Sequence, residues 1–271
     1  MIRSSIRLLV ALALTALIAS PALAQDDDDS VLKLAEPDFT LVSLPTTLRL
    51  PKYGSAFRVT HRFFRTLNDD IGDVASDFFG LDNGAAIGLE YRFGIIKNGQ
   101  LGVHRTSDNK TIEFFGQYGL LREAKAFVDV SALLSVEGTD NFQESKSPAI
   151  GAVISRTVKD WAAFYVQPIW INNTNRLPAD LVDDNSTFIV GLGTRIRIRP
   201  TLYLVAEAAP RAAGYAPDDI HASFAIEKRA GGHAFQLNFS TSTATTPAQL
   251  ARGGASVKDW VLGFNISRKF F

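Results

Sequence analysis

The chain has 271 residues, 46% of them hydrophobic, and its 28 basic and 28 acidic side chains give a formal net charge of zero. The absence of cysteine excludes disulfides and thiol catalysis, and the near-neutral charge provides no electrostatic footprint for nucleic acid. Beyond the N-terminus no apolar run of about 18 or more residues occurs, which excludes helical membrane spans.

Residues 1–24 have the three parts of a cleavable export signal. Arg3 and Arg7 supply the positive region, residues 8–19 form an apolar stretch too short to cross a bilayer, and Ala22-Leu23-Ala24 is a small-x-small cleavage site. The sequence therefore predicts Sec-type export and a mature chain that begins at Gln25.

Residues 25–52 are expected to form a periplasmic N-terminal tail. The run from Asp26 to Asp29 is interpreted as a solvated leader. A segment of this length could lay at most a short piece into the interior of the following domain, so no separate plug domain is expected.

From residue 53 to residue 271, apolar and polar side chains alternate with the period of two that is typical of β-strands. In residues 85–93, for example, Leu89 and Tyr91 share one face, while Glu90 and Arg92 share the other. An Arg placed toward lipid at the bilayer midplane would cost about 2–4 kcal/mol, so the polar face is expected to point inward.

Twelve strands are predicted, at approximately 54–66, 82–94, 100–106, 111–121, 126–138, 147–157, 161–172, 186–198, 202–211, 221–228, 233–242 and 258–271. An even number of antiparallel strands is what single-chain bacterial barrels require. The predicted fold is therefore an all-β, up-and-down transmembrane β-barrel in the outer membrane of a Gram-negative bacterium.

The predicted connections alternate between short turns and longer loops, except that the outer connection at 107–110 is also short. In outer-membrane barrels the short turns face the periplasm and the long loops face the exterior. Both termini are therefore expected to lie in the periplasm, and the loop at 243–257 is expected outside.

Three segments carry a resemblance to a known family: Arg58-Val59-Thr60-His61-Arg62-Phe63, Glu207-Ala208-Ala209-Pro210-Arg211 and Gly231-Gly232-His233-Ala234-Phe235-Gln236-Leu237. Through them the chain resembles an uncharacterised family of bacterial outer-membrane barrels, known as a domain of unknown function. The likeness covers most of the mature chain. It implies a barrel and brings no activity, so function has to be argued from the site.

The last strand also resembles the signal that the barrel-assembly machinery reads, an aromatic terminus with apolar residues at alternate positions. Phe264, Ile266 and Phe270 fit this pattern, whereas Arg268 interrupts it and the terminal Phe271 is out of phase. The resemblance implies that Phe270 takes the usual terminal role. Expected partners are this machinery and the lipid and lipopolysaccharide of the outer membrane.

The inward-facing set contains basic and acidic residues in similar number: Arg58, Arg62, Arg92, Arg195, Arg197 and Arg211 with Glu90, Glu113, Asp129, Glu137, Glu207 and Glu227. A barrel of about twelve strands lies between filled eight-stranded and open sixteen-stranded ones. Charged walls could line a narrow passage for small polar solutes, or they could form ion pairs that fill the interior. The sequence predicts a passive, porin-like channel, with a closed structural or interaction barrel displaying its loops as the alternative.

An enzymatic alternative rests on His221 and Ser223, which share a strand face as in twelve-stranded outer-membrane phospholipases. That pair would have to face lipid, but Phe224 and Ile226 lie on the strand face that is expected to point to lipid. The Asn-Gly that follows the phospholipase serine is also absent. We therefore expect the protein not to be an enzyme.

No metal site or cofactor is expected. The chain has only four histidines, and they show no paired spacing. The Asp-rich loop that begins at Asp69 lacks the spacing of an EF-hand, so it is interpreted as solvated.

Overall fold

The computed structural model describes residues 34–68, 71–76, 84–177, 181–182 and 184–271. The predicted export signal and the run from Asp26 to Asp29 lie outside these residues. So do four acidic positions of the first long loop: Asp69, Asp70, Asp77 and Asp82.

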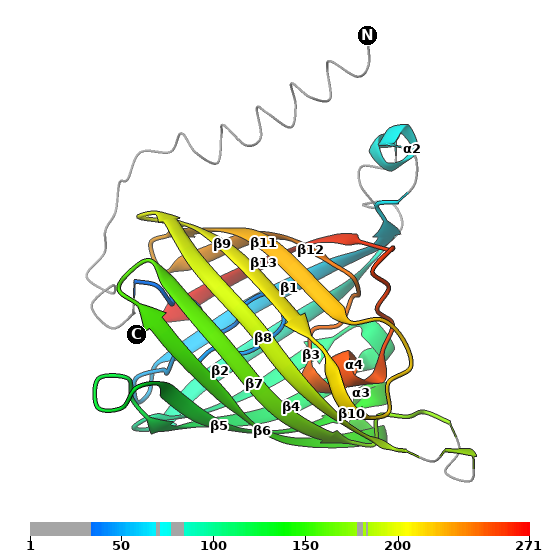
Figure 1. Cartoon of the computed structure of the whole chain (residues 1–271), viewed down its shortest axis with the longest axis horizontal. Coiled ribbons are helices and arrows are strands. Elements are labelled where there is room, and N and C mark those ends of the chain that lie inside the picture. The colour runs from blue at the N-terminus through cyan, green and yellow to red at the C-terminus, as the bar shows by residue number, and fades with distance from the viewer. Residues whose placement is uncertain (1–33, 69–70, 77–83, 178–180, 183) are drawn as a thin grey trace.

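The strands are β1 (Ser55–Thr66), β2 (Ala85–Ile96), β3 (Gly99–Thr106), β4 (Ile112–Leu121), β5 (Asp129–Gly138), β6 (Glu144–Val158), β7 (Ala162–Asn172), β8 (Ser186–Arg199), β9 (Leu202–Ala209), β10 (Arg211–Gly214), β11 (His221–Ala230), β12 (His233–Ser240) and β13 (Val261–Phe270). Neighbouring strands pair antiparallel around the wall, and pairing of β1 with β13 completes it (Figure 1). The predicted closed antiparallel barrel is confirmed.

The ninth strand of the barrel is interrupted at Pro210. Both β9 and β10 pair with β8, and the register shifts at the start of β10. Proline has no backbone N–H to donate to the ladder, which explains the break. Counted as one interrupted strand, β9 and β10 give the predicted total of twelve, although the ninth strand extends to Gly214 rather than ending at Arg211.

Side chains alternate between the two faces of the wall as predicted. On β2, for example, Leu89 is 48% exposed on the outer face, whereas the inward Glu90 is 4% exposed. An apolar outer face and internally paired backbone groups are what strands need in a lipid bilayer.

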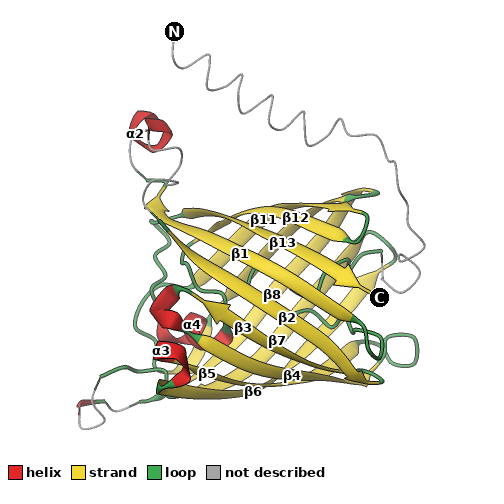
Figure 2. Ribbon diagram, turned by 180° about the vertical axis from the view of Figure 1, so that it is seen from behind, coloured by secondary structure: helices red, strands yellow, loops and turns green. Residues whose placement is uncertain are grey.

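The two ends of the barrel differ in their connections. The short-turn rim carries the connections 97–98, 122–128, 159–161, 200–201 and 231–232, and the long-loop rim carries 67–84, 107–111, 139–143, 173–185, 215–220 and 241–260. The helices α2 (Ile71–Ser76), α3 (Thr139–Phe142) and α4 (Pro247–Arg252) and the 3₁₀ turn η3 (Asp108–Lys110) all belong to long-loop connections. Figure 2 shows α3 and α4 together at this rim. Within the described ranges, no helix has the length and apolarity that a membrane span requires.

Residues 35–50, part of the segment expected to be a periplasmic tail, lie inside the barrel. Residues 35–48 are all buried. They form a hairpin in which the amide of Leu41 donates to the carbonyl of Leu44 at 2.8 Å and the amide of Thr46 donates to the carbonyl of Phe39 at 2.8 Å. We call residues 35–50 the plug hairpin.

The connection between β12 and β13 also turns inward, which corrects its prediction as an exterior loop. Residues 244–251 of this connection, including most of α4, are buried, and we call residues 241–256 the inner loop. Its Leu250 belongs to one apolar core with Leu41 and Leu44 of the plug hairpin and with Ile169 and Ile189 of the wall. Burial of these side chains explains why neither segment remains in solvent.

Candidate functional site

The tip of the plug hairpin is bound by one carboxylate of the wall. Glu207 on β9 accepts the backbone amides of Val42 at 3.0 Å, Ser43 at 2.9 Å and Leu44 at 3.1 Å. Successive amides that converge in this way form a nest for an anion, and hydrogen bonds to an ionised acceptor are stronger than neutral ones. The side chain of Glu207 therefore fixes the depth of the hairpin in the lumen.

A buried ion pair supports the same tip from the next strands. The guanidinium of Arg195 donates to the carbonyl of Thr40 at 2.6 Å and to the carboxylate of Glu227 at 3.0 Å, and both charged side chains are fully buried. Gln236 on β12 donates to the carbonyl of Leu41 at 3.0 Å and to Glu227 at 3.0 Å. The plug hairpin therefore completes the hydrogen bonding of a charge pair that is withdrawn from water.

A second charged group lies on β1 and β2. Arg58 pairs with Glu90 at 2.6 Å and donates to the hydroxyl of Thr40 at 2.8 Å. Arg92 pairs with the other carboxylate oxygen of Glu90. Arg62, fully buried on β1, donates to the carbonyl of Val42 at 3.3 Å.

Neutral side chains of the wall complete the set of contacts. Gln117 donates to the carbonyl of Thr46 at 2.7 Å, and Gln167 donates to the carbonyl of Pro45 at 2.8 Å. The side chain of Asn265 donates to the carbonyl of Val42 at 2.9 Å. Contacts to the hairpin thus come from strands all around the barrel, and the wall binds it as it would bind a polar ligand.

Glycines on β8 leave room for the apolar side chains of the hairpin. A Cβ atom on Gly193 would lie 2.1 Å from Leu41 Cδ1, and one on Gly191 would lie 3.0 Å from Leu44 Cδ1. Both distances are shorter than a normal carbon–carbon contact. The inward face of β8 is therefore shaped to the segment that fills the lumen.

The inner loop meets the hairpin from the opposite rim. The hydroxyl of Ser43 at the hairpin tip donates to the carbonyl of Ala244 at 3.0 Å. Arg211 on β10 holds α4 through the carbonyls of Leu250 at 2.8 Å and Ala251 at 3.2 Å. Between the two segments remains a cavity of 30 Å³, room for about one water molecule. In this state the middle of the lumen is filled.

The charges of one part of the wall are unevenly divided by sign, and the two inserted segments carry part of the compensation. On β1 and β2 Arg58, Arg62 and Arg92 outnumber the one buried acid, Glu90, whereas the acidic pair Glu113 and Glu137 face each other across β4 and β5. The positive charges that compensate the acidic side belong to the two segments inside the lumen and not to wall strands. Arg252 of the inner loop pairs with Glu137, and Arg49 of the plug hairpin approaches Asp129 to 3.6 Å.

Ten of the predicted lumen residues are buried inside: Arg58, Arg62, Glu90, Arg92, Glu113, Asp129, Glu137, Arg195, Glu207 and Glu227. Two differ. Arg197 lies near the end of β8, next to the short-turn rim. It is therefore only partly buried, and it donates to the carbonyl of Pro200 at 3.1 Å. Arg211 lies at the opposite rim, where it pairs with Asp218 at 2.9 Å and holds the inner loop.

His221 and Ser223 are both buried and face the lumen. Nε2 of His221 lies 2.9 Å from the hydroxyl of Ser223 and 3.3 Å from the carboxylate of Glu207, while Nδ1 lies 2.9 Å from the hydroxyl of Ser242. The catalytic Ser-His-acid triad has the serine on Nε2 and the acid on Nδ1. Here the acid lies on Nε2, which it shares with Ser223, and the serine on Nδ1 is Ser242. This reverses the order of the triad, so the group resembles a structural hydrogen-bond network.

Three of the predicted assembly residues lie on the outer face of β13, and the fourth, Phe271, follows its end. Phe270 is 47% exposed on the outer face, with Phe264 and Ile266 on the same parity. The out-of-phase Phe271 packs instead against Phe39 and Leu48 at the base of the plug hairpin. Among the described residues, no group of three or more His, Cys, Asp or Glu side chains could hold a metal ion.

Neither the plug hairpin nor the wall amides that bind it were predicted from the sequence, which allowed for at most a short inserted piece. The available signal was the apolar composition of a supposed tail, in which Leu41, Val42, Leu44, Leu48 and Leu50 lie close together. A solvated leader has no use for so many large aliphatic side chains. Many polar partners of the hairpin lie far away along the chain, as Gln117 lies 71 residues from Thr46, and could not be paired with it from the sequence.

A closed antiparallel barrel with an apolar outer face and a charged interior is the architecture of a β-barrel membrane protein. Residues 38–270 match the family described as "Membrane bound beta barrel domain (DUF5777)". The chain belongs to this family, which confirms the predicted resemblance to a family of unknown function. The match includes most of the plug hairpin as well as the wall.

Solved structures with a similar fold include outer-membrane porins. The NanC porin has a TM-score of 0.51 at 7% identity, with 80% of this chain and 99% of that chain covered. The Acinetobacter baumannii outer membrane protein Omp33 has a TM-score of 0.46 at 11% identity, covering 81% and 99%. A triple mutant of the Rhodopseudomonas blastica porin has a TM-score of 0.37 at 13% identity, covering 72% and 58%. The likeness to the NanC porin is one of fold alone. A search of curated proteins finds no match.

Proposed function

We propose that this protein is an outer-membrane channel for small polar solutes whose lumen is kept closed by the plug hairpin. The observation that carries the proposal is the uneven division of charge in the wall. The buried charges of β1 and β2 are three arginines and one acid, Glu90, whereas those of β4 and β5 are all acidic. Arg49 and Arg252, which compensate the acidic side, belong to the inserted segments. A barrel filled only for rigidity has no need of such a division, whereas a charged passage uses it to select solutes.

The path of the plug hairpin favours its release as a unit. At its start the carbonyl of Leu34 accepts the hydroxyl of Tyr203 at 2.9 Å, and just after its end the amide of Tyr53 donates to the carbonyl of Gly94 at 2.7 Å. Both contacts lie near the short-turn rim. A hairpin whose two ends leave through one rim can withdraw without breaking the pairing of any wall strand.

A permanently closed structural or interaction barrel is the second candidate. The 30 Å³ cavity between the plug hairpin and the inner loop favours it, because no solute passes through a space of that size. The two candidates differ in whether the wall encloses a conducting path once the hairpin is removed.

Single-channel conductance in planar bilayers separates these candidates. The full mature barrel is compared with two variants, a deletion of residues 35–50 and the substitution Glu207→Ala. The substitution serves if the deletion fails to fold. We expect the full barrel to be silent or to open rarely, the deletion to open steadily, and Glu207→Ala to open more often than the full barrel. Silence from both variants, with their fold shown by circular dichroism, would favour the permanently closed barrel.

We further infer that the chain is exported by the Sec pathway, assembled in the outer membrane by the barrel-assembly machinery, and surrounded there by lipid and lipopolysaccharide. The apolar outer face, with Leu89, Phe114 and Leu134 among its exposed side chains, supports contact with lipid. The burial of Ser223 and its sharing of His221 Nε2 with Glu207 support a protein that is not an enzyme. Membrane fractionation of cells expressing the full chain tests the location.

A further inference from the structure

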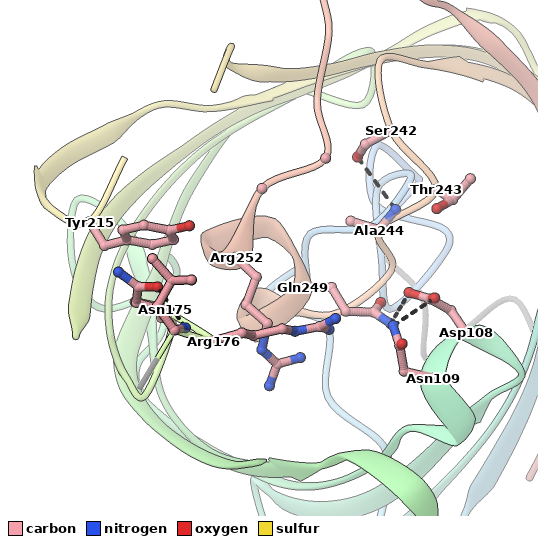
Figure 3. Close-up of a pocket in the computed structure, with 14 residues that line it drawn as sticks. Asp108, Asn109, Asn175, Arg176, Tyr215, Ser242, Thr243, Ala244, Gln249 and Arg252 are labelled. Atoms are coloured by element: carbon pink, nitrogen blue, oxygen red, sulfur yellow. Dashed lines mark hydrogen bonds between the residues drawn. The ribbon is translucent and has the colours of Figure 1, made fainter. Parts of the chain in front are cut away.

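A pocket at the long-loop rim is built from four connections of the barrel (Figure 3). Its volume is 430 Å³, within the range of about 300–1,000 Å³ that is usual for small-molecule sites. The turn η3, the connection that follows β7, the connection that follows β10 and the inner loop each contribute to the lining. The pocket is separate from the 30 Å³ cavity in the middle of the lumen.

Two guanidinium groups in this pocket have donors to offer. Arg176 is exposed and makes no ion pair within the described part of the chain. Arg252 is engaged through its terminal nitrogens with Glu137 and with the hydroxyl of Ser147, but its buried Nε has no hydrogen-bond partner among the residues that the structure describes. A buried donor without a partner is costly, and an anion in the pocket would supply the missing acceptor.

The remaining lining is mostly polar and neutral, with Leu177 and Ala244 as its apolar side chains. Tyr215, Asn175 and Thr243 contribute a phenol, an amide and a hydroxyl. The carboxylate of Asp108 is already occupied, since it accepts the side-chain amides of Gln249 at 3.1 Å and of Asn109 at 2.9 Å. Hydroxyl and amide groups of this kind match the hydroxyls of a solute, and the ring of Tyr215 offers a flat face for its carbon skeleton.

We propose that this pocket binds a small polyhydroxylated carboxylate, with Arg176 as the main partner of the carboxylate group. Planar guanidinium groups suit carboxylates because two parallel hydrogen bonds can form. The proposal names the solute class of the proposed channel and in that sense rests on the proposed function. Binding itself requires no conduction, so it is measured independently.

The pocket and the plug hairpin also share one structural element. Ala244 of the inner loop lines the pocket, and its carbonyl accepts the hydroxyl of Ser43 at the tip of the hairpin at 3.0 Å. A solute in the pocket therefore lies against the loop that contacts the closed plug.

Titration calorimetry of the folded full-length mature barrel tests the site. The probes are glucuronate and gluconate, a cyclic and an open-chain acid of similar size, with glucose as the neutral match. We expect the acids to bind and glucose to bind about tenfold more weakly or worse, because it forgoes hydrogen bonds to a charged group. Failure of both acids to bind, or equal binding of glucose, would overturn the proposal.

Substitution assigns the binding to the pocket. Arg176→Gln is expected to weaken binding of the acids about tenfold and to leave glucose unchanged. Lys110→Gln is the matched control, since Lys110 is an exposed cation at the same rim whose partner is Asp140 and which does not line the pocket. Equal effects of the two substitutions would contradict a role for Arg176. If the 35–50 deletion conducts and no acid binds, only this inference fails; if the acids bind and no variant conducts, only the proposed channel fails.

Discussion

At the scale of single residues, the backbone amides at the tip of the plug hairpin converge on Glu207. Glu207→Ala removes the acceptor of three backbone amides at the hairpin tip. Leaving buried donors without a partner costs about 1–3 kcal/mol each, so the hairpin is expected to detach more often. Trypsin cleavage after Arg49, followed by mass spectrometry, should become faster. Glu144→Ala, which changes an exposed acid at the start of β6, is the control and should leave the rate unchanged.

Two arginines of β8 make a matched pair for testing the assignment of the interior. Arg195→Ala leaves Glu227 as a buried charge without its cation, which costs about 3–5 kcal/mol. Arg197→Ala loses only contacts to the carbonyl of Pro200 and is expected to change stability by about 0.5 kcal/mol or less. Urea unfolding in detergent micelles measures both. Equal losses would show that the two positions do not differ in burial.

At the scale of elements, the fit between β8 and the plug hairpin can be broken from the wall side. Gly193→Leu places atoms where Leu41 lies, so we expect the hairpin tip to be displaced while the strand remains paired. The expected result is faster trypsin cleavage after Arg49 and more frequent channel openings. Gly116→Leu, on the outer face of β4 beside Leu101, is the control. Unchanged cleavage in Gly193→Leu would contradict the placement of the hairpin.

The elements that the sequence predicted are those with a local signal. Period-two alternation located the strands to within a few residues and assigned the inward faces, because lipid outside and charge inside leave one register. Pro210 shows the limit on β9, since its effect on pairing depends on which strand it faces. The plug hairpin shows a greater limit, because no periodicity marks it and its partners, such as Gln167 and Gln236, come from distant strands.

At the scale of the whole molecule, one chain supplies a barrel and both segments that fill it. The apolar core where Leu41 and Leu44 meet Leu250 draws the two segments inward from opposite rims. The charges of the wall were predictable as a set, but their division between β1–β2 and β4–β5, and the counter-charges on Arg49 and Arg252, emerge only when the barrel closes. The closed state is therefore a property of the assembled molecule.

The central claim is that residues 35–50 themselves close the lumen. Its most direct test is the conductance of the barrel that lacks these residues, recorded before and after addition of a synthetic peptide of residues 34–53, with a scrambled peptide as control. We expect steady openings that the native peptide blocks and the scrambled peptide leaves unchanged, with weaker block when the barrel also carries Glu207→Ala. A folded barrel that never conducts, or one whose conductance the native peptide does not change, would contradict it.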